Sequence, residues 1–192
     1  MSSERELYRL KGRTALVLGA AGELTRQAEA ALAAAGATVS QGTLEAYHAV
    51  GKTPAEFPNI VVLVTVTSDT PTANGDWEAV ERQQRTLVAL PTAILSNVVP
   101  AMRRAGWGRI IFIADGDPSS MAVITARTAQ AALLQAEARQ LAAAGITVNQ
   151  IVARSGSVTS GAELAEAIGA AALYFASEES SFVTGQSLQI GG

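Results

Sequence analysis

The sequence has 192 residues, of which 48% are hydrophobic and 16% are charged, and this balance excludes an intrinsically disordered chain. Its length predicts one domain, residues 1–192, large enough to bury a core. A net charge of −3 without a basic patch predicts no nucleic-acid partner. The chain has no cysteine and one histidine, His48, which we expect to be partly exposed; this excludes a disulfide framework and a multi-histidine or thiolate metal site. Without a bilayer-length apolar run or a signal peptide, we expect a cytoplasmic protein with no membrane contact.

Short apolar runs alternate with longer helical patterns along the chain. The expected strands cover residues 14–18, 37–40, 59–66, 109–114, 146–152 and 187–190. The expected helices cover residues 23–35, 77–104, 120–144 and 162–176. Strands rich in β-branched residues that alternate with helices are typical of a parallel sheet covered on both faces. The predicted fold class is therefore α/β: a Rossmann-like doubly wound parallel sheet of about six strands with helices on both faces.

Four segments of the chain, in the same order, resemble the short-chain dehydrogenase/reductase family. The family's first strand and cofactor loop resemble "LKGRTALVLGAAGEL", and the strand that carries its catalytic serine resembles "VVPAMRRAGWGRIIFIAD". Its next strand and its C-terminal signature are similar to "LAAAGITVNQIVA" and "ALYFASEESSFVTGQSLQIGG". The resemblance extends from Leu10 to Gly192 and implies the family's Rossmann-like fold.

The mechanism that this resemblance implies needs four side chains. A tyrosine exchanges a proton with the substrate oxygen while hydride moves to or from a nicotinamide. A lysine four residues later lowers the pKa of the tyrosine, because a phenol with a pKa of about 10 is otherwise a poor base at neutral pH. A serine polarises the substrate carbonyl, and an asparagine holds a water of the proton relay.

This sequence lacks the tyrosine–lysine pair. The residues four positions after its three tyrosines are Gly12, Gly51 and Glu178. Counting back from "GITVN" places Val123 at the tyrosine position and Arg127 at the lysine position. Arginine keeps the positive charge but has no phenol to activate.

The serine and asparagine of the family are also replaced. Asp115 stands at the serine position after "RIIFIA". The asparagine position falls on Leu87 when counted from the two prolines of the helix, and on Gln84 when counted from the tryptophan that begins it. Asp115 and Asp117 are either paired carboxylates for acid–base work or a turn and helix cap, and we favour the turn and cap. We expect Arg127 to form a structural ion pair with Asp115.

The loop after the first strand departs from the family's glycine pattern. Gly19 takes the first glycine position, Glu23 the second and Thr25 the third. Glu23 places a carboxylate where backbone amides would attract a pyrophosphate. In the other interpretation, which we favour, the loop is a tight turn in which Glu23 complements the helix dipole. Contacts that remain from a cofactor site would fall on Gly19, Ala20, Gly22 and Leu24.

The second strand ends in Ser40 and Gln41, so no acidic residue is placed to bind an adenosine ribose. NADP is therefore less disfavoured than NAD, and we expect no cofactor or only weak NADP binding. Compared with the family, three segments are short. Residues 41–58 have room for one short helix, whereas residues 116–122 and 153–160 are too short for a substrate loop and a lid. These deletions trim the crevice at the carboxyl ends of the strands.

In the family, the helices that correspond to residues 77–104 and 120–144 form a subunit interface, and the last strand with its preceding helix forms another. Here both helices keep their length, and the second is rich in alanine, which permits close helix approach. We expect this alanine-rich helix to bury little against its own sheet and to face a helix of another subunit. An alanine-rich composition without structural meaning is the alternative.

The sequence thus predicts a catalytically degenerate member of the family, a structural or regulatory subunit that assembles with an active paralogue. One alternative is an NADP-dependent oxidoreductase that uses Asp115 and Arg127 in a non-standard active site. Another is a binder of small molecules or acyl thioesters without chemistry. The sequence leaves open whether the assembly is a homo-oligomer or a hetero-oligomer.

Overall fold

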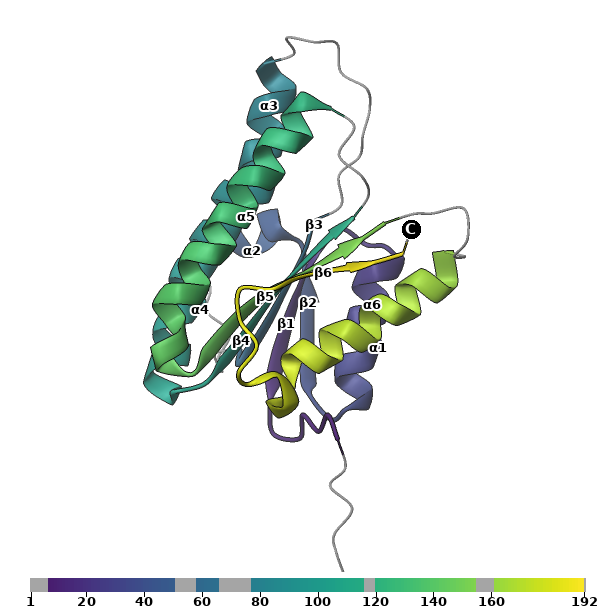
Figure 1. Ribbon diagram of the computed structural model, residues 1–192, viewed down its shortest axis with the longest axis vertical. Coiled ribbons are helices and arrows are strands. Elements are labelled where there is room, and N and C mark those ends of the chain that lie inside the picture. Colours follow the sequence, from purple (N-terminus) through teal and green to yellow (C-terminus); the bar gives the residue numbers. More distant parts are fainter. Residues whose placement is uncertain (1–6, 51–57, 66–76, 116–119, 155–160, 192) are drawn as a thin grey trace, which may run out of the picture.

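The computed structural model describes residues 7–50, 58–65, 77–115, 120–154 and 161–191. The sheet has six parallel strands in the order β2-β1-β3-β4-β5-β6, and its arrangement can be followed in Figure 1. The strands are β1 Thr14–Gly19, β2 Thr38–Gly42, β3 Ile60–Thr65, β4 Gly108–Asp115, β5 Ile146–Ala153 and β6 Ser187–Ile190. The predicted Rossmann-like sheet of about six strands is confirmed.

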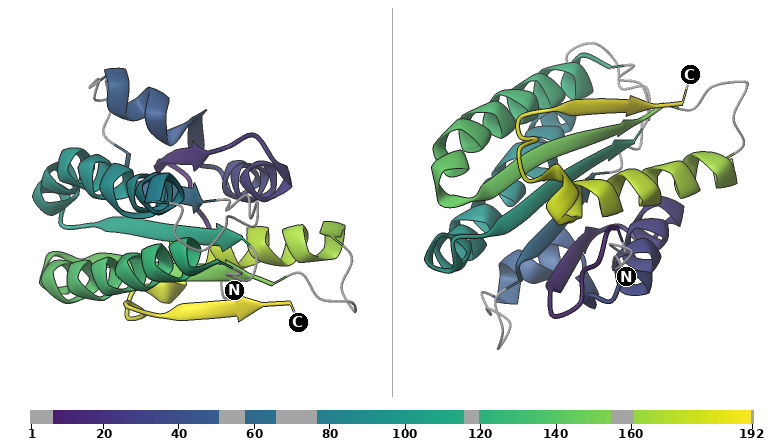
Figure 2. Two further views of the ribbon diagram at one scale, coloured as in Figure 1. Left: turned by 90° about the horizontal axis from the view of Figure 1, so that it is seen from above. Right: turned by 60° about the horizontal axis from the view of Figure 1, so that its bottom comes forward.

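Helices cover both faces of this sheet (Figure 2). They are α1 Glu23–Ala34, α2 Leu44–Val50, α3 Trp77–Gln84, α4 Leu90–Ala105, α5 Met121–Leu141 and α6 Gly161–Ala176. A π-helical turn, Arg85–Ala89, joins α3 to α4, and short 3₁₀ turns cover Ala142–Ala144 and Glu178–Ser180. The short helix α2 between β2 and β3 agrees with the expected room for one short helix there, and residues 51–57 lie outside the described part of the chain. The other two shortened segments fall mostly outside the described residues.

The strands bury alternate side chains on opposite faces, as their period of two requires. One face packs against α1 and α6; its buried members include Val17, Val62 and Ile113. The other packs against α2, α4 and α5; its buried members include Leu63 and Phe112. Because both faces are apolar, the strands have the continuous β-branched pattern from which the parallel sheet was predicted.

The alanine-rich helix α5 packs more closely against its own subunit than we expected from its sequence. A stripe with a spacing of about four residues is buried against β5, α3 and the π turn. Its members are Ala122, Val123, Ala126, Gln130, Leu134, Ala138 and Leu141. The expectation that this helix buries little was therefore wrong, because alanine lets the helix axis approach the sheet. Its outward side, which includes Ala131 and Ala132, is exposed.

The helix that runs from Trp77 to Ala105 has the length and composition of a membrane span, with a mean hydropathy of 1.2. In this fold the helix covers one face of the sheet, and its residues Ile94, Val98 and Met102 are buried there. Charged residues occupy its exposed side near both ends. We therefore interpret its hydropathy as that of a helix that contributes to the core.

The amino ends of the strands are joined by a dense polar cluster, defined by Arg13, Trp107, Arg109 and Glu178. The Glu178 carboxylate accepts hydrogen bonds from Arg13 (2.8 Å) and from the indole of Trp107 (2.9 Å), and lies 3.5 Å from the Arg109 guanidinium. The guanidinium carbons of Arg13 and Arg109 lie 3.6 and 4.2 Å from the centroid of the Trp107 ring. This amino-edge cluster closes the end of the sheet away from the crevice.

Candidate functional site

The strand order reverses between β1 and β3, and open α/β sheets bind ligands beyond the carboxyl ends of the strands at such a point. Gly19 ends β1 there. A Cβ atom on Gly19 would lie 2.7 Å from Cβ and 2.8 Å from the carbonyl oxygen of Val64 on β3. The packing of two neighbouring strands therefore already requires glycine at this position. Gly19 is not by itself a sign of a cofactor site.

Thr25, at the third glycine position, has a structural role that sequence reasoning missed. Its hydroxyl is buried and donates a hydrogen bond of 2.8 Å to the carbonyl oxygen of Ala20. The threonine side chain thus closes the β1–α1 loop on itself, in the place where a glycine would let helix and strand come closer. Gly22 is the N-cap of α1 in an extended conformation, and no side chain caps the helix there. Leu24 is half-buried against the core below.

The Glu23 carboxylate is held along the first turn of α1. It accepts a hydrogen bond of 2.9 Å from Gln27 and forms an ion pair with Arg26. The Gln27 hydrogen bond and the Arg26 charge lower the pKa of Glu23, although the side chain lies at the surface. Because Arg26 offsets its charge, Glu23 opposes an anion at the helix N-terminus less than the sequence alone suggests. The spacing Glu-x-x-Arg-Gln is a local signal that could have predicted this arrangement.

The positions of the catalytic tyrosine and asparagine lie inside the core. Val123 is 1% exposed, and its amide donates a hydrogen bond to the hydroxyl of Ser120, the N-cap of α5. Leu87 is fully buried in the π turn, and its carbonyl oxygen accepts a hydrogen bond of 2.9 Å from Gln130. Gln84, the other asparagine candidate, precedes this turn and is half-buried. Neither Leu87 nor Val123 offers a group that exchanges protons.

The remaining predicted site residues are only partly described. Asp115 is the last residue of β4, and its side chain lies outside the described part of the structure, as does all of Asp117. Arg127 is half-buried on α5, four residues after Val123. The ion pair between Arg127 and Asp115 therefore stays a prediction. Among the described residues, no group of three histidine, cysteine, aspartate or glutamate side chains is placed to hold a metal ion.

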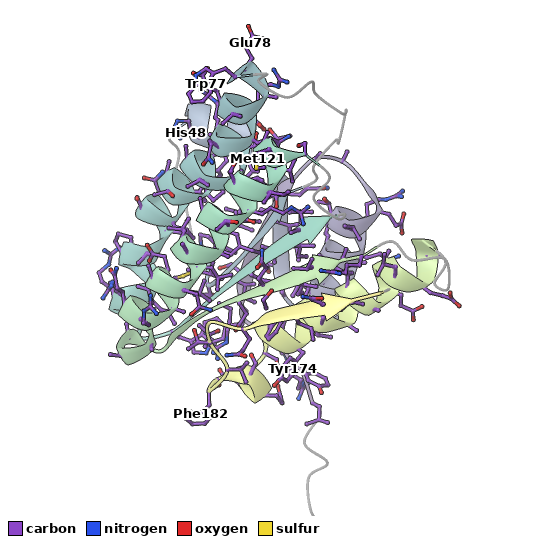
Figure 3. The ribbon with its side chains drawn as sticks, turned by 45° about the horizontal axis from the view of Figure 1, so that its top comes forward. His48, Trp77, Glu78, Met121, Tyr174 and Phe182 are labelled. Atoms are coloured by element: carbon purple, nitrogen blue, oxygen red, sulfur yellow. The ribbon has the colours of Figure 1, made fainter. Side chains whose placement is uncertain are left out.

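Tyr47 lies on α2 and packs, partly buried, against the apolar cluster on the α4 face of the sheet. Its hydroxyl is buried without a hydrogen-bond partner among the described residues, and burial raises its pKa. A catalytic tyrosine needs the opposite shift, because a lowered pKa is what makes a phenol a usable base. His48, the next residue, is exposed, as expected (Figure 3).

Large apolar side chains are exposed at the two ends of the molecule (Figure 3). Trp77 begins α3 and Met121 begins α5 at one end, whereas Phe182 lies at the opposite end, in the turn before β6. None of these side chains is an acid or a base.

Comparison with known proteins gives one relative by sequence. No protein-family model matches the chain. The chain is 32% identical over 129 residues to subunit BbsC of (2S)-[(R)-hydroxy(phenyl)methyl]succinyl-CoA dehydrogenase from Thauera aromatica. The match covers 55% of this chain and 50% of the relative, so the chain spans about half the length of the curated relative that it matches.

Solved structures share the fold over almost the whole chain. A gluconate 5-dehydrogenase from Burkholderia cenocepacia, in complex with NADP and tartrate, has a TM-score of 0.77 at 17% identity, covering 96% of each chain. A short-chain type dehydrogenase/reductase from Mycobacterium marinum has a TM-score of 0.71 at 20% identity, covering 98% of this chain and 97% of its own. The chain therefore has the fold of the short-chain dehydrogenases/reductases, as the resemblance to that family implied.

Proposed function

We propose that the chain is a non-catalytic structural or regulatory subunit, which assembles with an active paralogue that carries an intact Tyr-x-x-x-Lys pair. The observation that carries this proposal is the burial of Leu87 and Val123, the residues at the asparagine and tyrosine positions. A substrate cannot reach either position, and neither side chain can transfer a proton. The relative from Thauera aromatica is by its name one subunit of a dehydrogenase, which supports assembly with a second chain.

The outward faces of α4 and α5 are the association surface in this proposal. A shallow groove of about 330 Å³ runs between the two helices, and small or short side chains line much of it. Thr92, Ser96 and Val99 contribute from α4, whereas Glu137 and Gln140 contribute from α5. Small side chains let helices of two subunits approach closely, and a stable interface of this kind buries more than about 1,000 Å².

The decisive experiment compares the chain alone with the chain co-expressed with a relative that has the intact pair, sought first in the adjacent reading frame. Light scattering measures the mass of each preparation, and a carbonyl-reduction assay measures activity. We expect mixed oligomers, with all turnover assigned to the relative. A soluble monomer at high concentration, both alone and with the relative, would remove the support for this proposal.

The alternative is an oxidoreductase that binds NADP in a reduced crevice and uses Asp115 and Arg127. It is favoured by the NADP in the Burkholderia structure and by the open N-cap at Gly22. We propose instead that no cofactor binds, or NADP only weakly. Calorimetric titration with NADP distinguishes the two: a micromolar Kd, about −8 kcal/mol, supports the enzyme. Turnover that Asp115→Ala abolishes would also support the enzyme.

Coenzyme A is the second titrant in these calorimetric titrations, because the relative's name contains a CoA thioester.

The same proposal places the chain, residues 1–192, in the cytoplasm as one domain without nucleic-acid or membrane contact. Its net charge of −3 and the packing of the Trp77–Ala105 helix in the core support this placement. Fractionation of cells that produce the tagged chain tests it, and a membrane-bound fraction would contradict it.

A further inference from the structure

Three polar side chains form a continuous hydrogen-bonded chain between the sheet and the α4–α5 layer. Gln130 is fully buried on α5, Gln150 is buried on β5, and Ser187 begins the edge strand β6. The Gln130 amide donates to the Leu87 carbonyl at 2.9 Å, and the Gln150 amide donates to Oε1 of Gln130 at 3.4 Å. The Ser187 hydroxyl donates to Oε1 of Gln150 at 3.3 Å. We call these three residues the amide relay.

The relay begins at the π turn. The amide of Leu90 bonds to the carbonyl of Arg85, five residues earlier, so this turn contains one residue more than an α-helical turn. The Leu87 carbonyl accepts from Gln130 at this point. Pro91, four residues after Leu87, has no N–H, so the Leu87 carbonyl cannot make its α-helical hydrogen bond. The Gln130 side chain supplies the donor that Pro91 lacks.

The relay ends at β6, which is paired on one side only. The amides of Gln150 and Arg154 bond to the carbonyls of Gln186 and Ile190, and these bonds hold the edge strand. The Ser187 hydroxyl is the only relay member at the surface, since the residue is exposed. The relay therefore connects the π turn between α3 and α4 to the edge strand β6, through α5 and β5.

We propose that Gln130 and Gln150 are positioning residues that couple the π turn to the edge strand β6. A buried amide is costly when one of its bonds is lost, because the partner that remains is also left unpaired. Displacement of β6 frees Gln150, which weakens the hold of Gln130 on Leu87 and so disfavours the π turn. Coupling of this kind is reciprocal: a change in the π turn must alter β6 to the same extent.

This coupling relates two surfaces of the chain. The π turn lies within the helix whose outer face carries the proposed association surface, and β6 lies at the edge of the sheet, beyond α5 and β5. In this proposal, a contact made at β6 alters the π turn between α3 and α4. A contact made on that helix alters β6 in turn. The inference does not depend on the proposed function, because it concerns the full chain by itself and its test needs neither a partner nor a cofactor.

Amide hydrogen exchange, followed by NMR on the full chain, tests the coupling. Gln130→Met keeps the length of the side chain and removes its hydrogen bonds. We expect exchange at the Leu90, Gln150 and Arg154 amides to become about tenfold faster, the effect of one net hydrogen bond. Exchange in β1 and β3 should stay within about twofold of the unsubstituted chain. The matched control is Gln41→Met, an exposed glutamine on β2 outside the proposed association surface, which should change none of these rates.

The reciprocal test begins at the surface end of the relay. Ser187→Ala removes only the last, weaker bond, and we expect exchange at the distant Leu90 amide to become about threefold faster. If Gln130→Met does not fold, Ser187→Ala still tests the coupling between β6 and the π turn. Faster exchange at Leu90 alone after Gln130→Met would overturn the coupling, as would equal acceleration in β1 and β3. An unchanged Leu90 amide in Ser187→Ala would overturn it as well.

Discussion

The two ends of the parallel sheet contrast in their polar side chains. At the amino edge, Arg109 is 1% exposed and donates hydrogen bonds to the Ser177 carbonyl (3.1 Å), the Gly108 carbonyl (2.9 Å) and the Ser181 hydroxyl (3.1 Å). At the carboxyl edge, where open α/β sheets carry their chemistry, the tyrosine and asparagine positions hold buried Val123 and Leu87. Among the described residues, the buried polar groups of the amino edge join strands, whereas these two positions at the carboxyl edge are apolar.

The same contrast appears in the direction of the pKa shifts. Burial lowers the pKa of Arg109, and the Glu178 carboxylate opposes that shift, so the guanidinium stays charged and paired. On α2, burial raises the pKa of Tyr47 without a compensating partner among the described residues. Arg109 is thus buried with a carboxylate that favours its charge, whereas the Tyr47 phenol is held in a setting that disfavours its ionisation.

The largest expected effect is at the amino edge. Arg109→Met should lower the free energy of unfolding by about 3–5 kcal/mol, because it removes the hydrogen bonds that the buried guanidinium donates to the Ser177, Gly108 and Gly145 carbonyls. Urea denaturation followed by circular dichroism measures the change. The control is Arg139→Met on an exposed position of α5, where we expect a change within about 0.5 kcal/mol. Equal effects of the two substitutions would mean that the amino-edge cluster does not stabilise the fold.

The second prediction concerns the buried tyrosine position. Val123→Tyr with Arg127→Lys rebuilds the family's pair in sequence, but the ring does not fit a site that is 1% exposed. We expect a loss of about 1–3 kcal/mol from overpacking and no reduction of carbonyl substrates with NADPH. Thr128→Tyr, on an exposed position of the same helix, is the control and should be close to neutral. A folded double variant that turns over substrate would show that the crevice is more open than the structure indicates.

Most of the fold could be predicted from the sequence because its signals are local. The β-branched runs mark strands and the three-and-four spacing marks helices. Gly36, with φ +95°, marks the end of α1. The β1–α1 turn was also recognised, but its energetic reasons were not. Gly19 is required by Val64 on β3, and the donor to the Leu87 carbonyl is Gln130, 43 residues away. These contacts join distant segments and leave no local pattern, although Pro91 marks the Leu87 carbonyl as one without its α-helical donor.

The third prediction tests whether the outward face of α5 contacts another subunit. Ala132 is exposed in the chain, so Ala132→Glu should leave its stability unchanged within about 0.5 kcal/mol. In an interface the carboxylate would be buried without a partner, and we expect association to weaken at least about tenfold. Sedimentation or light scattering over a concentration series measures this. Ala30→Glu on exposed α1 is the matched control, and equal behaviour of both variants would exclude α5 from the interface.

The fourth prediction concerns the unpartnered phenol. Tyr47→Phe removes a buried hydroxyl that has no partner among the described residues, so stability at pH 7 should rise or stay within about 1 kcal/mol. The pKa of Tyr47 is raised in the folded state, so its contribution is complete below the unfolded pKa of about 10 and is lost as pH rises above that value. The variant should therefore lose less stability between pH 9 and about 11 than the unsubstituted chain. An identical alkaline slope in the two proteins would mean that the hydroxyl is hydrated.

The smallest expected effect is at Glu23, and it measures how much of a phosphate site remains at the carboxyl edge. Arg26 and Gln27 already hold this carboxylate, so Glu23→Gly should strengthen NADP binding by no more than about threefold. Glu23→Gln removes the charge and keeps the side chain, which separates electrostatics from backbone freedom. If both variants gain equally in calorimetric titrations, the charge was the obstacle. A gain of a hundredfold in either would show that the loop is an intact cradle opposed by a single carboxylate. That result would also contradict the interpretation that Thr25 and the Gly19–Val64 contact have made the loop a structural turn.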